Sequence, residues 1–173
     1  LNKFISNNEE KLLNREKSRS AINKALKLDN NLGEAYITKG NILGKFDWNW
    51  EGMKNMLEKG LNLDPNNAYG HMLLSDYYLV NSNFDMAIKE ARIAENLDPM
   101  NPYIGNWVGV IYCMANDYDR SIRQYQKVLE IFPSYGSVLN ELGFAQYLNG
   151  QKDDSRNSFI KLQEINGNYE LVK

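Results

Sequence analysis

Small and large apolar side chains recur along this chain at a fixed interval of 34 residues. Pro65, Pro99 and Pro133 keep that interval, and residues of similar size keep it in several other columns. These columns are Ser75, Gly109 and Gly143; Met53, Ala87, Ser121 and Ser155; Gly60, Ala94, Val128 and Leu162; and Trp50, Phe84 and Tyr118, with Lys152 in the fourth place. Several independent columns with one shared period indicate an internal structural repeat.

The columns have the residue types that a pair of packed helices requires. A proline cannot continue a helix, so each one closes a unit. A small residue midway along the first helix allows the second helix to approach closely, and small residues on the second helix do the same. Large side chains fill the remaining space: Leu43, Tyr78 and Tyr112 from first helices, and Leu57, Tyr125 and Phe159 from second helices. The pattern predicts an all-α chain of antiparallel helix pairs.

The motif within each unit resembles the tetratricopeptide repeat (TPR), which reads W-x2-L-G-x2-Y, then A-x3-F, then P. One unit contains Gly105-x2-Val108-Gly109-x2-Tyr112, then Ser121-x3-Tyr125, then Pro133. The resemblance implies an α-solenoid in the form of a right-handed superhelix, with about four full repeats and an N-terminal half repeat. The predicted ranges within a single array, 1–173, are 8–30 for the half repeat, 33–65, 68–99, 102–133 and 136–166 for the full repeats, and 167–173 for a truncated or capping tail.

Two places depart from a regular array. A long helix is expected over 9–28, with Asn8 as its N-cap, because Ile22, Ala25 and Leu28 match a second helix. The unit 33–65 contains one extra residue near Trp48. Its segment Phe46-Asp47-Trp48-Asn49-Trp50 resembles a turn in the C-terminal repeats of some bacterial transcriptional regulators and nucleotide cyclases. That likeness implies one arm of a larger bacterial regulatory protein. The alternative is an insertion that buries two tryptophans.

Composition narrows the classes of function. The chain of 173 residues has a formal net charge of -2, whereas nucleic-acid binders usually have a basic excess, so no direct nucleic-acid partner is expected. Cys113 is the only cysteine, which excludes an intrachain disulfide and fits a reducing, cytoplasmic location. No apolar stretch approaches the roughly 20 residues of a membrane span, so no membrane partner is expected. Because the sequence begins with Leu1, we expect an excerpt or a processed product.

Catalytic chemistry is not indicated. His71 is the sole histidine and occupies a position that the family fills with a core side chain, so a packing role is expected. Cys113 has no second histidine or nearby cation to activate it. The sequence contains no glycine-rich phosphate loop, no His-Glu-x-x-His motif and no paired carboxylates. We therefore expect neither an enzyme, nor a cofactor, nor a metal site.

The resemblance implies instead that the first helices line a concave groove that binds a peptide or protein segment. Carried over by alignment, Ile37 and Thr38 join that groove, and Glu141 adds an acidic spot. The aromatic, methionine and asparagine side chains favour partner contact. The groove residues expected from the alignment are Asn41, Tyr69, Met72, Leu73, Asp76, Tyr103, Asn106, Trp107, Val110, Asn140, Phe144 and Tyr147. An alternative interpretation places Leu73 and Trp107 partly in the core.

Two other modes of action were weighed. The cations with which some repeats of this family hold a C-terminal carboxylate are missing, and Asp76 and Glu141 would repel a carboxylate, so such a clamp is not expected. Self-association is the alternative to peptide binding. After the helix that ends near Ile165, only a short tail containing Tyr169, Leu171 and Val172 remains to cover the last apolar face. An uncapped end predicts a homo-oligomer.

Overall fold

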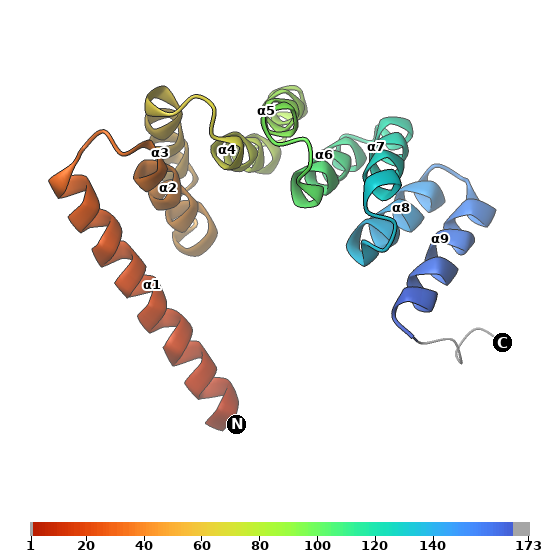
Figure 1. The fold of residues 1–173 in the computed structure, drawn as a ribbon, viewed down its shortest axis with the longest axis horizontal. Helices are drawn as coiled ribbons and strands as arrows, with labels where there is room; N and C mark the ends of the chain where they lie inside the picture. Colours follow the sequence, from red (N-terminus) through yellow and green to blue (C-terminus); the bar gives the residue numbers. More distant parts are fainter. Residues whose placement is uncertain (1, 168–173) are drawn as a thin grey trace. The chain divides into compact units, whose positions relative to one another are not determined.

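The computed structural model describes residues 2–167, with side chains for 13–167, and all regular structure in that part of the chain is α-helical. The residues form two compact units, one ending at Tyr77 and the other beginning at Tyr78, and each is described by itself. The helices are α1 Asn2–Leu28, α2 Gly33–Asp47, α3 Trp50–Leu63, α4 Ala68–Val80, α5 Phe84–Leu97, α6 Pro102–Met114, α7 Tyr118–Ile131, α8 Gly136–Leu148 and α9 Lys152–Ile165 (Figure 1).

The first unit is built on the α2–α3 pair, and α1 contacts α2. A Cβ atom on Gly40 would lie only 3.1 Å from Leu57, so the absence of a side chain allows α3 to approach. Met53 and Leu57 of α3 are fully buried. Gly70 on the first part of α4 packs against Leu61 in the same way. The small residues therefore have the role that the sequence predicted.

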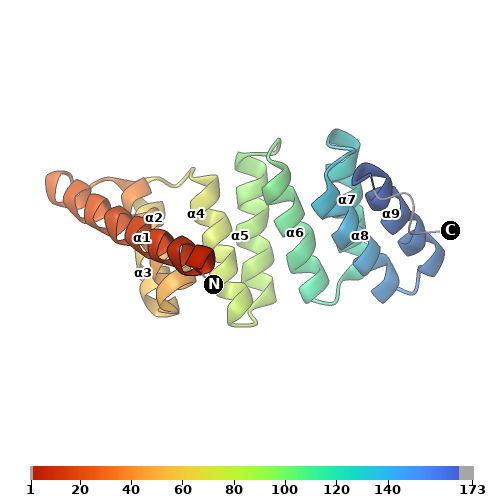
Figure 2. The same cartoon turned by 90° about the horizontal axis from the view of Figure 1, so that it is seen from below.

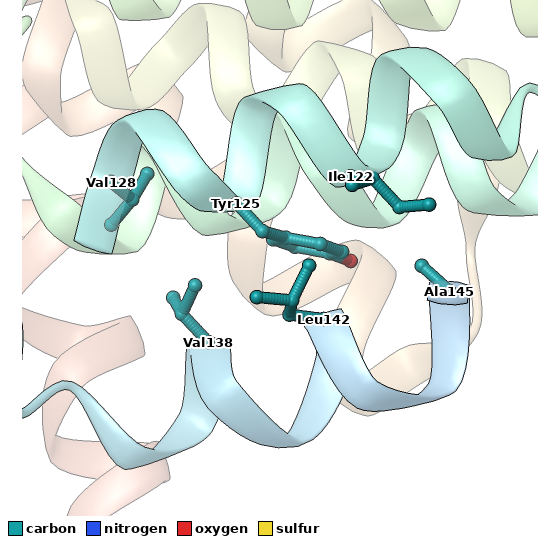
Figure 3. Packing of buried hydrophobic residues seen from close by; sticks show 6 residues of the cluster. All are labelled: Ile122, Tyr125, Val128, Val138, Leu142 and Ala145. Carbon is teal, nitrogen blue, oxygen red and sulfur yellow. The ribbon is translucent and has the colours of Figure 1, made fainter. Parts of the chain in front are cut away.

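The second unit contains α5 to α9, in which α6 packs on α7 and α8 on α9 (Figure 2). The ring of Tyr125 is fully buried between α7 and α8. Ser121 and Ser155, 34 residues apart, each donate a hydrogen bond from Oγ to a first-helix carbonyl, at 2.9 and 2.8 Å. Figure 3 shows the cluster around Tyr125, which comprises Ile122, Val128, Val138, Leu142 and Ala145.

The turns inside the helix pairs repeat as regularly as the core. Trp48, Ser82, Asn116 and Gly150 follow one another at the 34-residue interval, and all four have a positive φ. The next residue begins a helix: Asn49, Asn83 and Asp117 each accept a hydrogen bond from a backbone N–H of the first turn, at 2.8, 3.3 and 3.1 Å. Such side-chain caps satisfy donors that the helix leaves unpaired. Gln151 occupies the fourth place and makes no such bond.

The predicted all-α fold of helix pairs is confirmed, and two local expectations are wrong. The first helix begins at Asn2, so Asn8 lies inside the helix and is not its cap. The insertion does not bury both tryptophans, because Trp48 is 74% exposed and meets Trp50 edge to face with ring centroids 6.0 Å apart. Asn49 N–H donates to Leu43 O, six residues back, whereas the equivalent bond from Asn83 reaches five residues back. This hydrogen bond places the extra residue inside the α2–α3 turn.

Candidate functional site

One surface of the second unit is formed by the sides of α6 and α8 that turn away from their partner helices. Gly105 and Gly109 mark the side of α6 that packs on α7, because a Cβ there would clash with Val128 and Tyr125. Residues two or five positions beyond a helical residue lie on the opposite side of the helix. The opposite side of α6 therefore carries Tyr103, Trp107, Val110 and Met114. Since α6 contacts α8, the corresponding side of α8 extends this surface with Glu141, Phe144 and Leu148.

This surface, which we call the α6–α8 face, exposes large apolar side chains. Tyr103 is 50% exposed, Met114 57% and Phe144 51%. Phe144 is held in place by an edge-to-face contact with Phe159 of α9, with ring centroids 5.4 Å apart. Trp107 is half-buried and packs against the core formed by α5 and α6. The face thus offers rings whose positions are set by the core beneath them.

The flanks of the face carry the polar groups. Asn106 is half-buried, and its Oδ1 has no hydrogen-bond partner among the described residues. Cys113 lies on the same flank of α6 and packs against Val138 and Leu142 of α8. Tyr147 holds the equivalent position on α8 but is 61% exposed, because no further first helix covers that flank in the described part of the chain.

The charge on the face is a single carboxylate. Neither α6 nor α8 contains a lysine or arginine, and Glu141 is their only acidic residue. Its influence reaches the buried groups of the interior. Burial, followed by the charge of Glu141, raises the pKa of the Cys113 thiol. Burial also raises the pKa of Tyr125, to which Glu141 adds. The face is therefore apolar and aromatic with one negative charge.

Two residues considered for chemistry have structural roles. The raised pKa of Cys113 keeps its thiol protonated at neutral pH, which is the reverse of what a nucleophile needs. His71 lies with its Nε2 3.0 Å from the carbonyl oxygen of Pro65. Since a carbonyl can only accept, Nε2 carries the proton and the ring ties the start of α4 to the preceding turn. Both residues are occupied by packing.

In the first unit the predicted groove residues separate into two groups. Met72 and Leu73 are 1% and 0% exposed, so the expectation that they contact a ligand is corrected: both are core residues of α4. Ile37 is likewise buried, and its side chain lies where a Cβ on Gly70 would be. Tyr69 remains 44% exposed and accepts a hydrogen bond from Asn41 Nδ2 at 3.0 Å.

The remaining predicted residues have intermediate exposure. They are Thr38, Asn41 and Asp76 in the first unit, and Val110 and Asn140 in the second. Val110 lies near the centre of the α6–α8 face, and Asn140 lies on its outer flank beside Tyr147. The structure thus brings together those predicted residues that belong to α6 and α8.

Sequence reasoning missed Met114 and Leu148, which are 57% and 52% exposed at the ends of α6 and α8. A signal for them was present in the sequence. Residues 103, 107, 110 and 114 follow helical spacing along one stripe, and Leu148 stands 34 residues after Met114. These two side chains extend the apolar face toward the ends of both helices.

Within the described residues, no group of three or more histidine, cysteine, aspartate or glutamate side chains is placed to hold a metal ion. None of the described helices combines the length and apolar character that a membrane crossing demands.

No model of a protein family and no curated protein sequence matches this chain. Solved structures do match. MamA is 22% identical, with a TM-score of 0.75, and the match covers 86% of each chain. A MamA fragment from Desulfovibrio magneticus RS-1 is 17% identical with a TM-score of 0.78, over 97% of this chain and 96% of that one. YrrB, described as a TPR protein with an unusual peptide-binding site, is 18% identical with a TM-score of 0.71, over 85% and 75%.

The chain has the tetratricopeptide repeat fold. The low identities of these structures establish the fold alone, and they agree with the repeat that the columns of small and large residues predicted. PilF from Pseudomonas aeruginosa, 15% identical with a TM-score of 0.77, shares it over 89% of this chain.

Proposed function

We propose that this protein is a scaffold that binds a peptide segment of a partner protein on the α6–α8 face. The observation that carries the proposal is the cluster of exposed aromatic and methionine side chains there, Tyr103, Met114 and Phe144. Large, rigid aromatic groups provide most of the energy at protein interfaces. YrrB, a protein of the same fold, has a peptide-binding site.

The charge of the face defines the ligand further. Glu141 is the only charged residue that α6 and α8 supply, so a basic side chain of the peptide has one partner and an acidic one has none. Asn106 can turn its carboxamide toward a peptide backbone without losing a bond from Oδ1, which has no partner in the protein. The ligand is a segment with aromatic or aliphatic anchors and one lysine or arginine.

The first unit contributes a smaller contact in this proposal. Tyr69 is exposed, and its hydroxyl accepts from Asn41 and can still donate to a peptide carbonyl. Asp76 is the acidic group of that part of the proposed binding surface. Substitution of Tyr69 by alanine tests this contribution separately from the α6–α8 face.

Selection from a displayed library of random 12-residue peptides tests the function. We expect enriched peptides with two apolar anchors and one basic residue, bound with micromolar affinity, about -8 kcal/mol. Phe144→Ala and Trp107→Ala should each weaken binding of an enriched peptide at least about tenfold, the effect of about 1.4 kcal/mol. Glu141→Lys should reverse the preference for basic peptides.

Gln126→Ala, an exposed change on α7, is the matched control and should leave the affinity unchanged. Circular dichroism of each variant shows that the helices remain folded. A library that yields no enriched peptide contradicts the proposal, and so does an affinity that Phe144→Ala and Trp107→Ala leave intact.

Self-association is the second candidate, because the outer flank of α8 exposes Tyr147 and Leu148. The tail residues Tyr169, Leu171 and Val172, expected to begin a cap, lie outside the described residues. If this flank joins two copies, Tyr147→Lys converts a dimer into a monomer in light-scattering measurements. A wild-type protein that is monomeric at high concentration excludes this function.

The wider context belongs to the proposal as well. The Phe46-Asp47-Trp48-Asn49-Trp50 turn and its likeness to bacterial regulators suggest that the scaffold serves a cytoplasmic regulatory protein. Co-purification of the natural gene product with its neighbours in the genome tests that role. A partner set without a regulator or a cyclase would contradict it.

A further inference from the structure

The groove between α1 and α2 in the first unit is lined on one side by a helix without its own first-helix partner. Ile22 of α1 stands 35 residues before Leu57 of α3, and Ser18 stands 35 before Met53. In α3 those two positions are fully buried against Gly40 and Gly44 of the first helix. In α1, Ser18 is exposed and Ile22 only half-buried.

The groove has the size and lining of a binding surface. One part, of about 500 Å³, is lined by Asn14, Arg15, Ser18, Ile42 and Phe46. The adjoining part is lined by Arg19, Ile22, Asn23, Lys39, Ile42 and Leu43. Apolar side chains from both helices form its floor, and no acidic residue lines either part. The surface is therefore apolar in the middle and positively charged at its edges.

The cations differ in how far they are already paired. Arg19 is bound to Asp47 at the end of α2. Arg15 stacks over the ring of Phe46, with its guanidinium carbon 4.1 Å from the ring centroid, and its buried Nε has no hydrogen-bond acceptor among the described residues. A buried donor without a partner is costly, so Arg15 favours an occupant that brings a carboxylate.

We propose that the α1–α2 groove binds an amphipathic helix of a partner protein, with two small residues four positions apart and a carboxylate one turn further on. The chain itself shows how such a helix fits a second helix. Gly40 meets Leu57 and Gly44 meets Met53, so the first helix runs antiparallel to the second. An incoming helix in that orientation places its small residues opposite Ile22 and Ser18.

The same orientation brings the C-terminal end of the incoming helix to Arg15. That end carries the negative pole of the helix dipole as well as the carboxylate, and both are stabilised by a cation. The α2 sequence has this pattern in Gly40, Gly44 and Asp47. A synthetic peptide of residues 33–48, acetylated and amidated, therefore serves as the probe.

Titration of the ¹⁵N-labelled protein with this peptide, followed by NMR, tests the inference. We expect shift changes confined to residues 14–23 of α1 and 39–46 of α2, with a dissociation constant at or below about 1 mM. Arg15→Gln should weaken binding about tenfold, and an Asp47→Asn peptide should do the same. Combining the two changes should cause little further loss, because they remove one shared interaction.

The controls separate this groove from the rest of the surface. Lys17→Gln, on α1 but outside the groove lining, should leave the affinity unchanged. Ser18→Phe fills the groove, and a peptide with leucine in place of Gly40 and Gly44 cannot approach it, so both should abolish binding. Phe144→Ala should have no effect here, which keeps failure of this inference distinct from failure of the α6–α8 proposal.

Three results would overturn the inference. The first is absence of shift changes in α1 and α2 at 2 mM peptide, a concentration about twice the expected limit. The second is a wild-type dimer that Ser18→Phe dissociates, since a second copy of the chain would then be the occupant. The third is a full natural polypeptide in which another of its own segments already protects this groove from the peptide.

Discussion

At the scale of single residues, Glu95 of α5 shows how this fold accommodates a buried charge. It is only 4% exposed, and burial alone would raise the pKa of its carboxyl group. Hydrogen bonds from Lys127 and Gln124 at 2.8 Å, together with the charge of Arg92, outweigh burial and leave the pKa below its ordinary value of 4.5. The ionised form therefore links α5 to α7.

We predict that Glu95→Gln lowers the free energy of unfolding by about 1–3 kcal/mol at pH 7, because charge-assisted hydrogen bonds are lost. A lowered folded-state pKa means that the unfolded chain takes up the proton first. The stabilisation is therefore complete above about pH 4.5 and disappears as the pH falls through the folded-state pKa.

Urea unfolding at pH 7, 5 and 3.5 measures this difference between wild type and variant. Glu58→Gln is the control, because its exposed pair with Lys54 at 3.8 Å should contribute less than about 0.5 kcal/mol. A Glu95→Gln deficit that stays constant down to pH 3.5 would contradict the assignment of the charge.

At the scale of helices, the turn inside each pair is a local device repeated along the chain. A residue with positive φ is followed by an N-cap, and the side chains of Asn49, Asn83 and Asp117 fulfil the capping role. Gln151 is the exception, because its side chain makes no capping bond to α9. The last pair therefore begins its second helix without a device that the other three share.

Gln151→Asp should supply the missing cap and raise the free energy of unfolding by about 0.5–1 kcal/mol. The reverse change at an equivalent position, Asp117→Ala, should lower it by about 1 kcal/mol. Thermal unfolding followed by circular dichroism compares both with wild type. Equal melting temperatures for wild type and Gln151→Asp would show that the α8–α9 turn cannot use the added carboxylate.

At the scale of the whole molecule, the stability of a repeat protein comes from contacts between neighbouring elements. The strongest pairings in the described part of the chain join α2 to α3, α6 to α7 and α8 to α9. The buried ring of Tyr125 contributes to the core shared by α7 and α8 (Figure 3). Damage to that core should therefore remain regional.

Tyr125→Ala should destabilise the second unit by about 3–5 kcal/mol, the cost of truncating a buried aromatic side chain. Hydrogen exchange followed by mass spectrometry should show faster exchange in α6 to α9, whereas α2 and α3 keep their protection. Equal acceleration of exchange in α2 and α3 would mean that the chain unfolds as one cooperative block.

The sequence by itself determined the helix pairs, their turns and their close approach, because these depend on residues within one 34-residue period. Gly40, Ser121 and the caps at Asn83 and Asp117 act on neighbours only a few turns away. The period also predicted the side of each first helix on which partner-binding residues lie.

Only the tertiary structure decided which of those residues reach solvent, since burial depends on the helices packed around each one. Met72 and Leu73 share the positions of Asn106 and Trp107 in the period, yet only the first two are fully buried. Tyr147 is exposed where Cys113 is covered, because α8 covers one flank and leaves the other open. The groove beside α1 likewise follows from how α1 packs on α2, and this packing gives Ser18 and Arg15 a surface that no spacing in the sequence could reveal.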